Sequence, residues 1–180
     1  RQLFGVAYGN STFVAVGGGD TILTSPDWPI SWTTRLSGGP LANQYNGVAY
    51  GNGMFVAVGD SIKTSSDNGI TWITRLNTAA QYNGVTYGNG VFVVVGTYGL
   101  IVSSSDLINW TTRHGGSNGM QHLNDITYGN STFVAVGDSG TMLSSDGTDI
   151  DTWYDTSWSI NNNLNGITYG GANFITIHYL

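Results

Sequence analysis

Hydrophobic residues along the chain fall into short runs of β-branched and aromatic side chains, separated by links rich in Gly, Asn, Ser and Asp. Runs of this length and composition predict buried β-strands. No stretch shows the 3.6-residue apolar period of an amphipathic helix, so the pattern predicts an all-β protein. The five clearest runs each begin with Phe and cover residues 13–16, 55–58, 92–95, 133–136 and 174–177.

A Tyr-Gly pair precedes each of these runs and recurs every 37 to 42 residues. Each of the first four repeats contains four predicted strands. Strand A ends in the Tyr-Gly pair, strand B is the Phe-led run, and strands C and D follow. Strand C is predicted at residues 21–24, 61–64, 100–103 and 141–143, and strand D carries Trp32, Trp72, Trp110 or Trp153. Four-stranded units that recur at about this period, roughly 40 residues, predict a β-propeller.

The fifth repeat contains only strands A and B, in residues 166–180. We therefore predict one domain over residues 1–180, with about five radial units. Four are complete blades at about 1–40, 41–78, 79–117 and 118–160, and the fifth is a partial, two-stranded blade at 161–180. Three closures stay open: a small five-bladed ring, a fragment of a larger ring, and closure by another chain. An open half-blade would expose unpaired backbone groups to strand addition.

The link between strands C and D carries a recurring motif. Residues 65–72 have the form Ser-x-Asp-x-Gly-x-Thr-Trp, with Ser65, Asp67, Gly69, Thr71 and Trp72 at the named positions. Partial matches occur at Ser25, Asp27 and Trp32 (with Pro29 in place of Gly), at Ser104, Asp106 and Trp110, and at Ser144, Asp146 and Trp153.

The motif resembles the Asp-box, also called the bacterial neuraminidase repeat, which is found in sialidases and other propellers. The resemblance covers nearly the whole chain through the repeat. It implies a structural element on the blade periphery, away from the catalytic face. Physically, we expect the Asp carboxylate to accept hydrogen bonds from its own turn, and the Trp to cover that turn.

Composition narrows the range of functions. The formal net charge is −6, with one Lys and four Arg, which argues against a nucleic-acid binder because such affinity depends on basic residues at phosphates. No apolar run is long enough for a membrane-spanning helix, so we expect no membrane insertion. The chain has no Cys, which excludes disulfides and thiolate chemistry.

The sialidase resemblance raises the question of catalysis. In that family the chemistry needs a Tyr nucleophile paired with Glu, an Asp acid and three converging arginines, but this chain has no Glu. Arg35, Arg75 and Arg113 each stand three residues after a Trp, so they occupy one repeat position rather than converging on an axis. We therefore predict a protein that is not an enzyme and needs no cofactor.

The sequence contains two groups of possible metal ligands. The three histidines, His114, His122 and His178, show no metal-ligand spacing, and without Cys a zinc site is disfavoured. Asp146, Asp149 and Asp151 cluster in the enlarged fourth C–D link and could hold Ca²⁺ through oxygen ligands. Their spacing matches no known calcium loop, so a solvated acidic turn is the simpler interpretation.

In propellers the D–A and B–C connections share one face, where ligands bind. The D–A connections here vary in length, as a binding face requires. Polar side chains recur just before strand A, beside two aromatic residues: Gln44, Gln81, His122 and Asn163, with Tyr45 and Tyr82. They could bind sugar hydroxyls and stack on sugar rings, or they could tie one repeat to the next.

Three functions remain open at this point. The first is a recognition propeller, extracellular or on a cell or virion surface, that binds a glycan or a protein surface through D–A and B–C loops. The second is a structural assembly module that self-associates through the incomplete fifth blade. The third, ranked lowest, is a sialidase-type glycoside hydrolase or a fragment of one. The extracellular or virion location is an expectation from few charges with much Gly, Asn, Ser and Thr.

Overall fold

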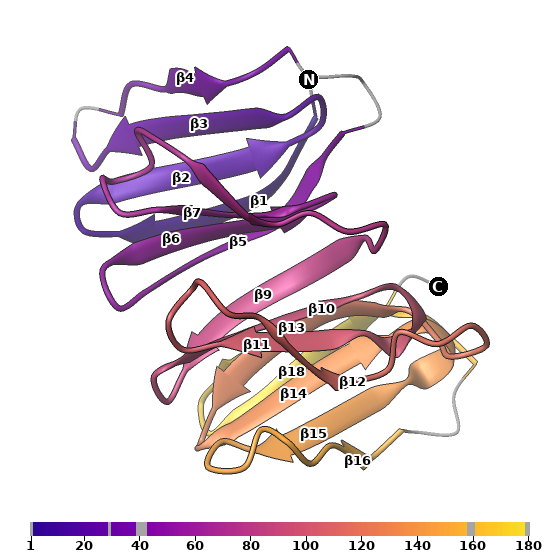
Figure 1. Ribbon diagram of the computed structural model, residues 1–180. Helices are drawn as coiled ribbons and strands as arrows, with labels where there is room; N and C mark the ends of the chain where they lie inside the picture. The colour runs from indigo at the N-terminus through magenta and orange to yellow at the C-terminus, as the bar shows by residue number, and fades with distance from the viewer. Residues whose placement is uncertain (1, 29, 39–42, 158–160, 179–180) are drawn as a thin grey trace. The chain divides into compact units, whose positions relative to one another are not determined.

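The computed structural model describes residues 2–28, 30–38, 43–157 and 161–178, and within them every regular element except two short 3-10 turns is a β-strand. The strands form five antiparallel sheets in chain order (Figure 1). Sheet 1 contains β1 (Leu3–Gly9), β2 (Thr12–Gly17), β3 (Thr21–Pro26) and β4 (Thr33–Leu36). Sheet 2 contains β5 (Tyr45–Gly51), β6 (Met54–Gly59), β7 (Ile62–Ser65) and β8 (Ile73–Leu76).

Sheet 3 contains β9 (Tyr82–Gly88), β10 (Val91–Gly96), β11 (Ile101–Ser104) and β12 (Thr111–His114). Sheet 4 contains β13 (Leu123–Gly129), β14 (Thr132–Gly137), β15 (Met142–Asp146) and β16 (Tyr154–Asp155). Sheet 5 has two strands, β17 (Leu164–Gly170) and β18 (Asn173–His178). The chain divides into two compact units, Arg1–Tyr82 and Asn83–Leu180, which are described separately. The predicted single domain over 1–180 stays a prediction.

The hairpins between strands A and B are tight two-residue turns. Both central residues have positive φ, as in Asn52 (47°) with Gly53 (75°) and in Asn89 (45°) with Gly90 (82°). This backbone matches the twist of the flanking strands, and Asn and Gly tolerate it best. The Asn-Gly links therefore form the hairpins between strands A and B of sheets 2 and 3.

Two boundaries differ from the predictions. Strand A begins at Tyr45 and Tyr82, which the sequence placed in the preceding loops. Strand D does not contain its Trp: β8 begins at Ile73, directly after Trp72. The reason is that the Trp72 indole Nε1–H donates to the Gly69 carbonyl (2.9 Å), which holds the residue in the turn.

Two connections between strands B and C contain short 3-10 turns that hydrophobic periodicity did not predict. They are η1 (Thr97–Gly99) and η2 (Asp138–Gly140). Each is kinked at its centre, where Tyr98 (φ 57°) and Ser139 (φ 54°) adopt the left-handed conformation. Three residues are too few for an apolar period to register.

Within each unit, neighbouring sheets pack face to face, and each sheet carries two faces of different composition. We call the face that packs against the preceding sheet the leading face, and the one that packs against the following sheet the trailing face. In the first unit, Val14 and Val16 on the trailing face of sheet 1 pack against Tyr45, Phe55 and Ala57 on the leading face of sheet 2.

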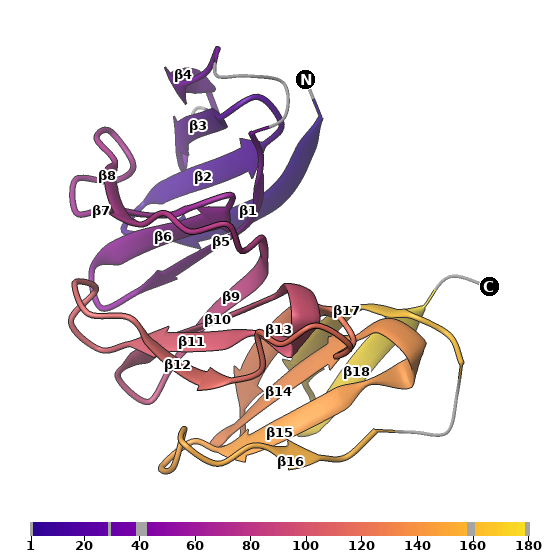
Figure 2. The ribbon, with the colours of Figure 1, turned by 45° about the vertical axis from the view of Figure 1, so that its right-hand side comes forward.

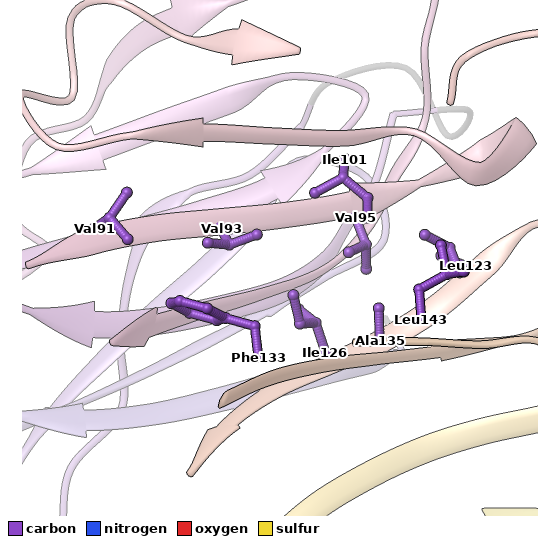
Figure 3. Packing of buried hydrophobic residues seen from close by; sticks show 9 residues of the cluster. All are labelled: Val91, Val93, Val95, Ile101, Leu123, Ile126, Phe133, Ala135 and Leu143. Atoms are coloured by element: carbon purple, nitrogen blue, oxygen red, sulfur yellow. The ribbon is translucent and has the colours of Figure 1, made fainter. Parts of the chain in front are cut away.

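The second unit repeats this arrangement. Val93 and Val95 of sheet 3 face Ile126, Phe133 and Ala135 of sheet 4, as Figure 3 shows from close by. Sheet 4 then packs its trailing face on sheet 5, and β17 lies beside β13 and β14 (Figure 2). The side chains of that contact are Val134, Val136, Leu164 and Ile167. Alternation along each strand sends one set of residues to each face, so sheet 4, which lies between sheets 3 and 5, buries both of its faces.

Two recurring contacts fix the approach of neighbouring sheets. First, the Tyr of strand A covers the Gly that ends strand A of the preceding sheet. A Cβ at Gly9, Gly88 or Gly129 would lie 2.1 to 2.2 Å from a ring atom of the next sheet's Tyr. No side chain fits at that distance, so Gly is required there by space rather than by backbone conformation.

Second, the Asn at the second position of strand A donates to a main-chain carbonyl at the start of the next strand A. Asn83 Nδ2 donates to the Leu123 carbonyl (2.8 Å), and Asn124 Nδ2 donates to the Leu164 carbonyl (3.1 Å). Within the first unit, Asn46 Nδ2 donates to Tyr82 O in the same way (2.8 Å). These amides therefore tie one repeat to the next.

Candidate functional site

The C–D turn of sheet 2 is held by its acidic residue. The Asp67 carboxylate accepts hydrogen bonds from the Thr71 backbone N–H (2.9 Å), the Thr71 hydroxyl (2.7 Å) and the Ser65 hydroxyl (2.8 Å). The Thr71 bonds lower the pKa of Asp67 to about 2. Ser65 is buried and accepts from the Gly69 N–H (2.9 Å), and the Trp72 indole caps the turn. The carboxylate is thus engaged within its own turn.

The fourth C–D turn uses different residues from those the sequence indicated. Ser145, not Ser144, pairs with Phe133 and so takes the position that Ser65 holds opposite Phe55. The Thr152 hydroxyl before Trp153 donates to Asp149 (3.0 Å) rather than to Asp146. The two inserted residues shift the register, which a motif match at fixed spacing could not detect.

The first and third turns depart further from the pattern. In the third, Asp106 accepts from the Asn109 and Ile108 backbone N–H groups (2.8 and 2.9 Å), which hold its pKa well below the usual value. The indole N–H of Trp110 is buried and has no partner among the described residues, because this turn is one residue shorter. In the first turn, a hydrogen bond to Asp27 raises the pKa of Tyr8, and Pro29 lies outside the described residues.

The arginines occupy one repeat position. The Nε–H groups of Arg35 and Arg75 donate to the Thr24 and Thr64 hydroxyls of strand C in their own sheets (2.8 and 2.9 Å). Arg113 donates likewise to the Ser103 hydroxyl (2.8 Å). Each guanidinium is therefore fixed against its own sheet.

The calcium hypothesis is not supported by the geometry. The Asp146 carboxylate accepts from Thr148, and Asp149 accepts from the Asp151 N–H and the Thr152 hydroxyl. Asp151 forms an ion pair with Arg113. In the part of the chain that the structure describes, no three acidic or histidine side chains converge as a metal site would require. Each carboxylate instead accepts hydrogen bonds within its own turn or pairs with Arg113, so the three do not point toward one another.

The two tyrosines that the sequence suggests as ligand-binding residues are buried in the structure. Tyr45 and Tyr82 are only 2 % and 1 % exposed, so neither ring offers a face for stacking on a sugar. Burial raises the pKa of Tyr45 to about 12. The Tyr82 hydroxyl pairs with Thr78 Oγ1 (3.2 Å). The signal was present in the sequence, since this position is Leu or Tyr in all five repeats, as a core position would be.

The polar residues before strand A contact the B–C turns. His122 Nδ1 accepts from the Tyr98 N–H (3.0 Å), and Asn163 Oδ1 accepts from the Ser139 N–H (3.1 Å). These side chains tie a repeat to the turn of the preceding one. Gln44 donates its backbone N–H to Asp60 Oδ2 (2.7 Å), and Gln81 is half-buried with contacts of its own.

A polar hollow of about 270 Å³ lies in the first unit, among B–C and D–A residues. Asp20 and Asp60 come from the B–C connections of sheets 1 and 2, and Lys63, the only lysine of the chain, from strand C of sheet 2. Hydroxyl and amide side chains complete its lining: Asn43, Tyr45, Ser61, Thr74 and Asn77. We call this site the polar hollow.

The charged groups of the polar hollow are held in place. Lys63 Nζ donates to Thr74 Oγ1 (2.6 Å), and Asn43 Nδ2 donates to Asp20 Oδ2 (3.2 Å). Asp60 Oδ2 accepts from the Gln44 backbone. Each carboxylate keeps further lone pairs for a ligand, since an ionised carboxylate can accept about four hydrogen bonds. Sequence reasoning missed this site because its parts come from two repeats, although a single lysine beside turn aspartates was visible.

The five sheets, their packing within each unit and the likeness to solved propellers define a β-propeller with four four-stranded blades and a two-stranded fifth, as predicted. No family model and no curated protein sequence matches the chain. In the described residues, no helix has the length and apolar character needed to cross a bilayer.

Solved structures do match. A chain in the crystal structure of a nidogen/laminin complex has a TM-score of 0.73 at 14 % identity, over 98 % of this chain and 72 % of that one. YCF48 bound to D1 peptide gives 0.68 at 14 % identity, over 98 % and 60 %. The computationally designed Ika8 protein gives 0.71 at 10 % identity, over 98 % and 55 %. This chain thus spans about three quarters of the first match and less than two thirds of the other two.

Proposed function

We propose that this chain is a non-catalytic recognition propeller, and that it binds a protein segment in the polar hollow of its first unit. The observation that carries the proposal is the grouping of Asp20, Asp60 and Lys63 around one hollow, which is lined by residues of the B–C and D–A connections and of the strands of sheet 2. Two carboxylates beside one ammonium suit a segment with a basic side chain and polar neighbours, because paired hydrogen-bonded charges set orientation and specificity.

Two further points support a protein partner over a glycan. The buried Tyr45 and Tyr82 rings remove the aromatic platforms on which the glycan hypothesis depended. Solved structures of similar fold include a nidogen/laminin complex and YCF48 bound to D1 peptide. A non-catalytic role is supported by the absence of Glu from the sequence and by arginines fixed at one repeat position.

Selection of a random peptide display library against the whole chain tests the proposal. We expect enriched peptides to carry Arg or Lys, and Asp60→Asn to weaken their binding by about tenfold, the equivalent of one lost charge-assisted contact. Asp138→Asn is the matched control, because Asp138 follows the corresponding Gly of sheet 4 and lies outside the hollow. Its binding should equal that of the unmodified chain.

The same preparation should be applied to a glycan array and to a fluorogenic sialoside. If the chain binds a glycan but no peptide, and Asp60→Asn abolishes that binding, the ligand of the polar hollow is a sugar rather than a protein segment. Turnover of the sialoside would contradict the non-catalytic proposal.

We further propose that recognition takes place outside the cell or on a virion surface, and that the C–D turns are related to the Asp-box. The low charge with much Gly, Asn, Ser and Thr supports the location. The Asp67 hydrogen bonds to Thr71 and Ser65 support the relation. Recovery of the native protein from a cytosolic fraction alone would contradict the location.

A further inference from the structure

Within the second unit, no described residue covers the trailing face of sheet 5, although this face has the residues that the trailing faces of sheets 1, 3 and 4 bury. Ile175 and Ile177 of β18 are 54 % and 60 % exposed, whereas Val14 and Val16 at the same positions of sheet 1 are fully buried. The Gly that ends strand A is buried in the first four sheets, but Gly170 is exposed. No described atom lies within 4 Å of a Cβ built at Gly170.

Within the first unit, the leading face of sheet 1 is likewise left uncovered by the described residues. Leu3, Val6 and Tyr8 are 47 %, 64 % and 52 % exposed. Their counterparts in sheet 5, Leu164 and Ile167, are 2 % and 8 % exposed. Exposed apolar groups arranged in this way mark an interaction surface rather than scattered surface residues.

The Tyr8 ring already has the pose that its counterparts use at the occupied contacts. Its centroid lies 4.7 Å from that of Phe13, and the ring pairs of the other four repeats lie at 4.6 to 4.9 Å. The ring therefore needs no rearrangement to cover a Gly of the type of Gly170. A surface organised before binding loses less conformational entropy on association.

The hydrogen-bond donor of the trailing face is present too. Asn165 holds the position of Asn83 and Asn124, whose amides donate to carbonyls of the next sheet. In sheet 5, Asn165 Nδ2 instead donates to the Asn163 carbonyl (3.3 Å). The counterpart of the Leu123 and Leu164 carbonyls in the first repeat is the carbonyl of Leu3. A hollow of about 210 Å³ beside Gly166, Ile175 and Ile177 leaves room for a side chain at the position of Val6.

We propose that the trailing face of sheet 5 binds the leading face of sheet 1 of a second copy of this chain, and continues the internal contact between sheets. Tyr8 of one copy covers Gly170 of the other, Val6 packs beside Ile177, and Asn165 donates to Leu3. The contact joins two different surfaces, so it builds closed rings or open filaments rather than isologous dimers. This proposal goes beyond the polar hollow, which lies elsewhere in the first unit.

Cysteine substitution on each face tests the contact directly, since the chain has no Cys of its own. The residues at the positions of Ile177 and Val6 share a buried cluster in sheets 4 and 5, as Val136 and Ile167. Chains with Ile177→Cys, mixed in equal amount under oxidation with chains with Val6→Cys, should form the mixed disulfide dimer well beyond the twofold excess over each symmetric dimer that random coupling gives. The random ratio of 1:2:1, an excess of a symmetric dimer, or no dimer at all would overturn the proposal.

Gly170→Ala separates docking from folding. The added methyl group meets open space in the free chain, but a docked Tyr ring would lie about as close as at Gly129. We expect sedimentation velocity to show self-association of the unmodified chain, weakened at least about tenfold in Gly170→Ala. Gly18→Ala is the control, because its Cβ also has only distant neighbours and its φ is not positive. Both variants should unfold at the temperature of the unmodified chain.

Two results would count against a second copy. A monomer at every concentration would overturn the proposal. So would an intramolecular disulfide in a monomeric chain with both Val6→Cys and Ile177→Cys, because the two faces would then belong to one molecule.

Discussion

Sheets 4 and 5 present the same trailing face in different surroundings. On sheet 4, Gly129 lies under the Tyr169 ring and Asn124 donates to the Leu164 carbonyl. On sheet 5, Gly170 faces open space and Asn165 bonds within its own repeat. The comparison teaches that a recurring residue in this chain specifies a contact with the next repeat. Its energetic value therefore depends on whether that repeat is present.

The largest difference is expected at the first position of strand A. Leu164→Ala removes a side chain that is 2 % exposed and leaves a cavity between sheets 4 and 5, so it should cost about 3 kcal/mol of unfolding free energy. Leu3→Ala, at the same position but 47 % exposed, should cost less than about 1 kcal/mol. Urea unfolding of both variants at low protein concentration measures the difference, and equal losses would break the comparison.

The next effect is an overpacking effect at the terminal Gly of strand A. In Gly129→Ala the new methyl group meets the Tyr169 ring, and the strain should cost about 2 kcal/mol. In Gly170→Ala the cost should be within about 0.5 kcal/mol of zero, because the reduced freedom of the unfolded chain offsets small losses. Thermal unfolding of both variants measures the change in stability that each substitution causes, and equal changes would contradict the prediction.

A smaller effect is expected for the amides. Asn124→Ala removes donors to the Leu164 carbonyl and to Asp138, and should destabilise the chain by about 1 kcal/mol. Asn165→Ala removes one exposed local bond, and its effect should lie near zero. Hydrogen exchange at the Ile167 amide reports whether the loss of stability falls at the contact of sheets 4 and 5. An unchanged exchange rate in Asn124→Ala would argue against a stabilising role of the Asn124–Leu164 hydrogen bond.

The smallest effect concerns pH. Asp125 Oδ2 accepts from the Ile167 N–H of sheet 5 (2.9 Å), and burial raises the pKa of Asp125 above its ordinary value of 3.8. A raised folded pKa means that the stability linked to this group is complete below pH 3.8 and falls as pH rises through the folded pKa. Asp125→Asn should therefore gain stability relative to the unmodified chain between about pH 3 and pH 7.

The C–D turn of sheet 2 is a control for that measurement, because its linkage has the opposite sign. With a folded pKa of about 2, Asp67 contributes stability above its ordinary pKa that is lost as pH falls through about 2. The Asp67→Asn variant should therefore be less stable than the unmodified chain at neutral pH, and this difference in unfolding free energy should become smaller as the pH falls toward 2. If both variants followed the same pH trend, burial of Asp125 would not be the cause.

Periodicity alone was sufficient to predict the fold. The Tyr-Gly spacing predicted five units, the Phe-led runs predicted strand B, and the two-stranded fifth sheet followed from the residues of the last repeat. These features depend on local alternation and on turns such as Asn52-Gly53, which the sequence encodes directly.

The candidate site was less predictable, for physical reasons. The polar residues before Tyr45 predict a loop at this position, whereas the burial of Tyr45 depends on Val14 and Val16, which belong to another repeat. The polar hollow joins Asp20 to Lys63 across two sheets, and strand pairing in one repeat does not specify such neighbours. Two residues are inserted in the fourth C–D turn, so the spacing of the motif does not show that Ser145 holds the position of Ser65. Only the pairing of Ser145 with Phe133 across the sheet shows it.

One double-mutant cycle tests most directly whether the Gly of one repeat exists to receive the Tyr of the next. Gly129→Ala is measured by equilibrium unfolding in the unmodified chain and again in Tyr169→Ala, where the ring is absent. We predict that the cost of Gly129→Ala falls from about 2 kcal/mol to near zero in the second background, a coupling typical of residues in contact. The same cost in both backgrounds would contradict the account.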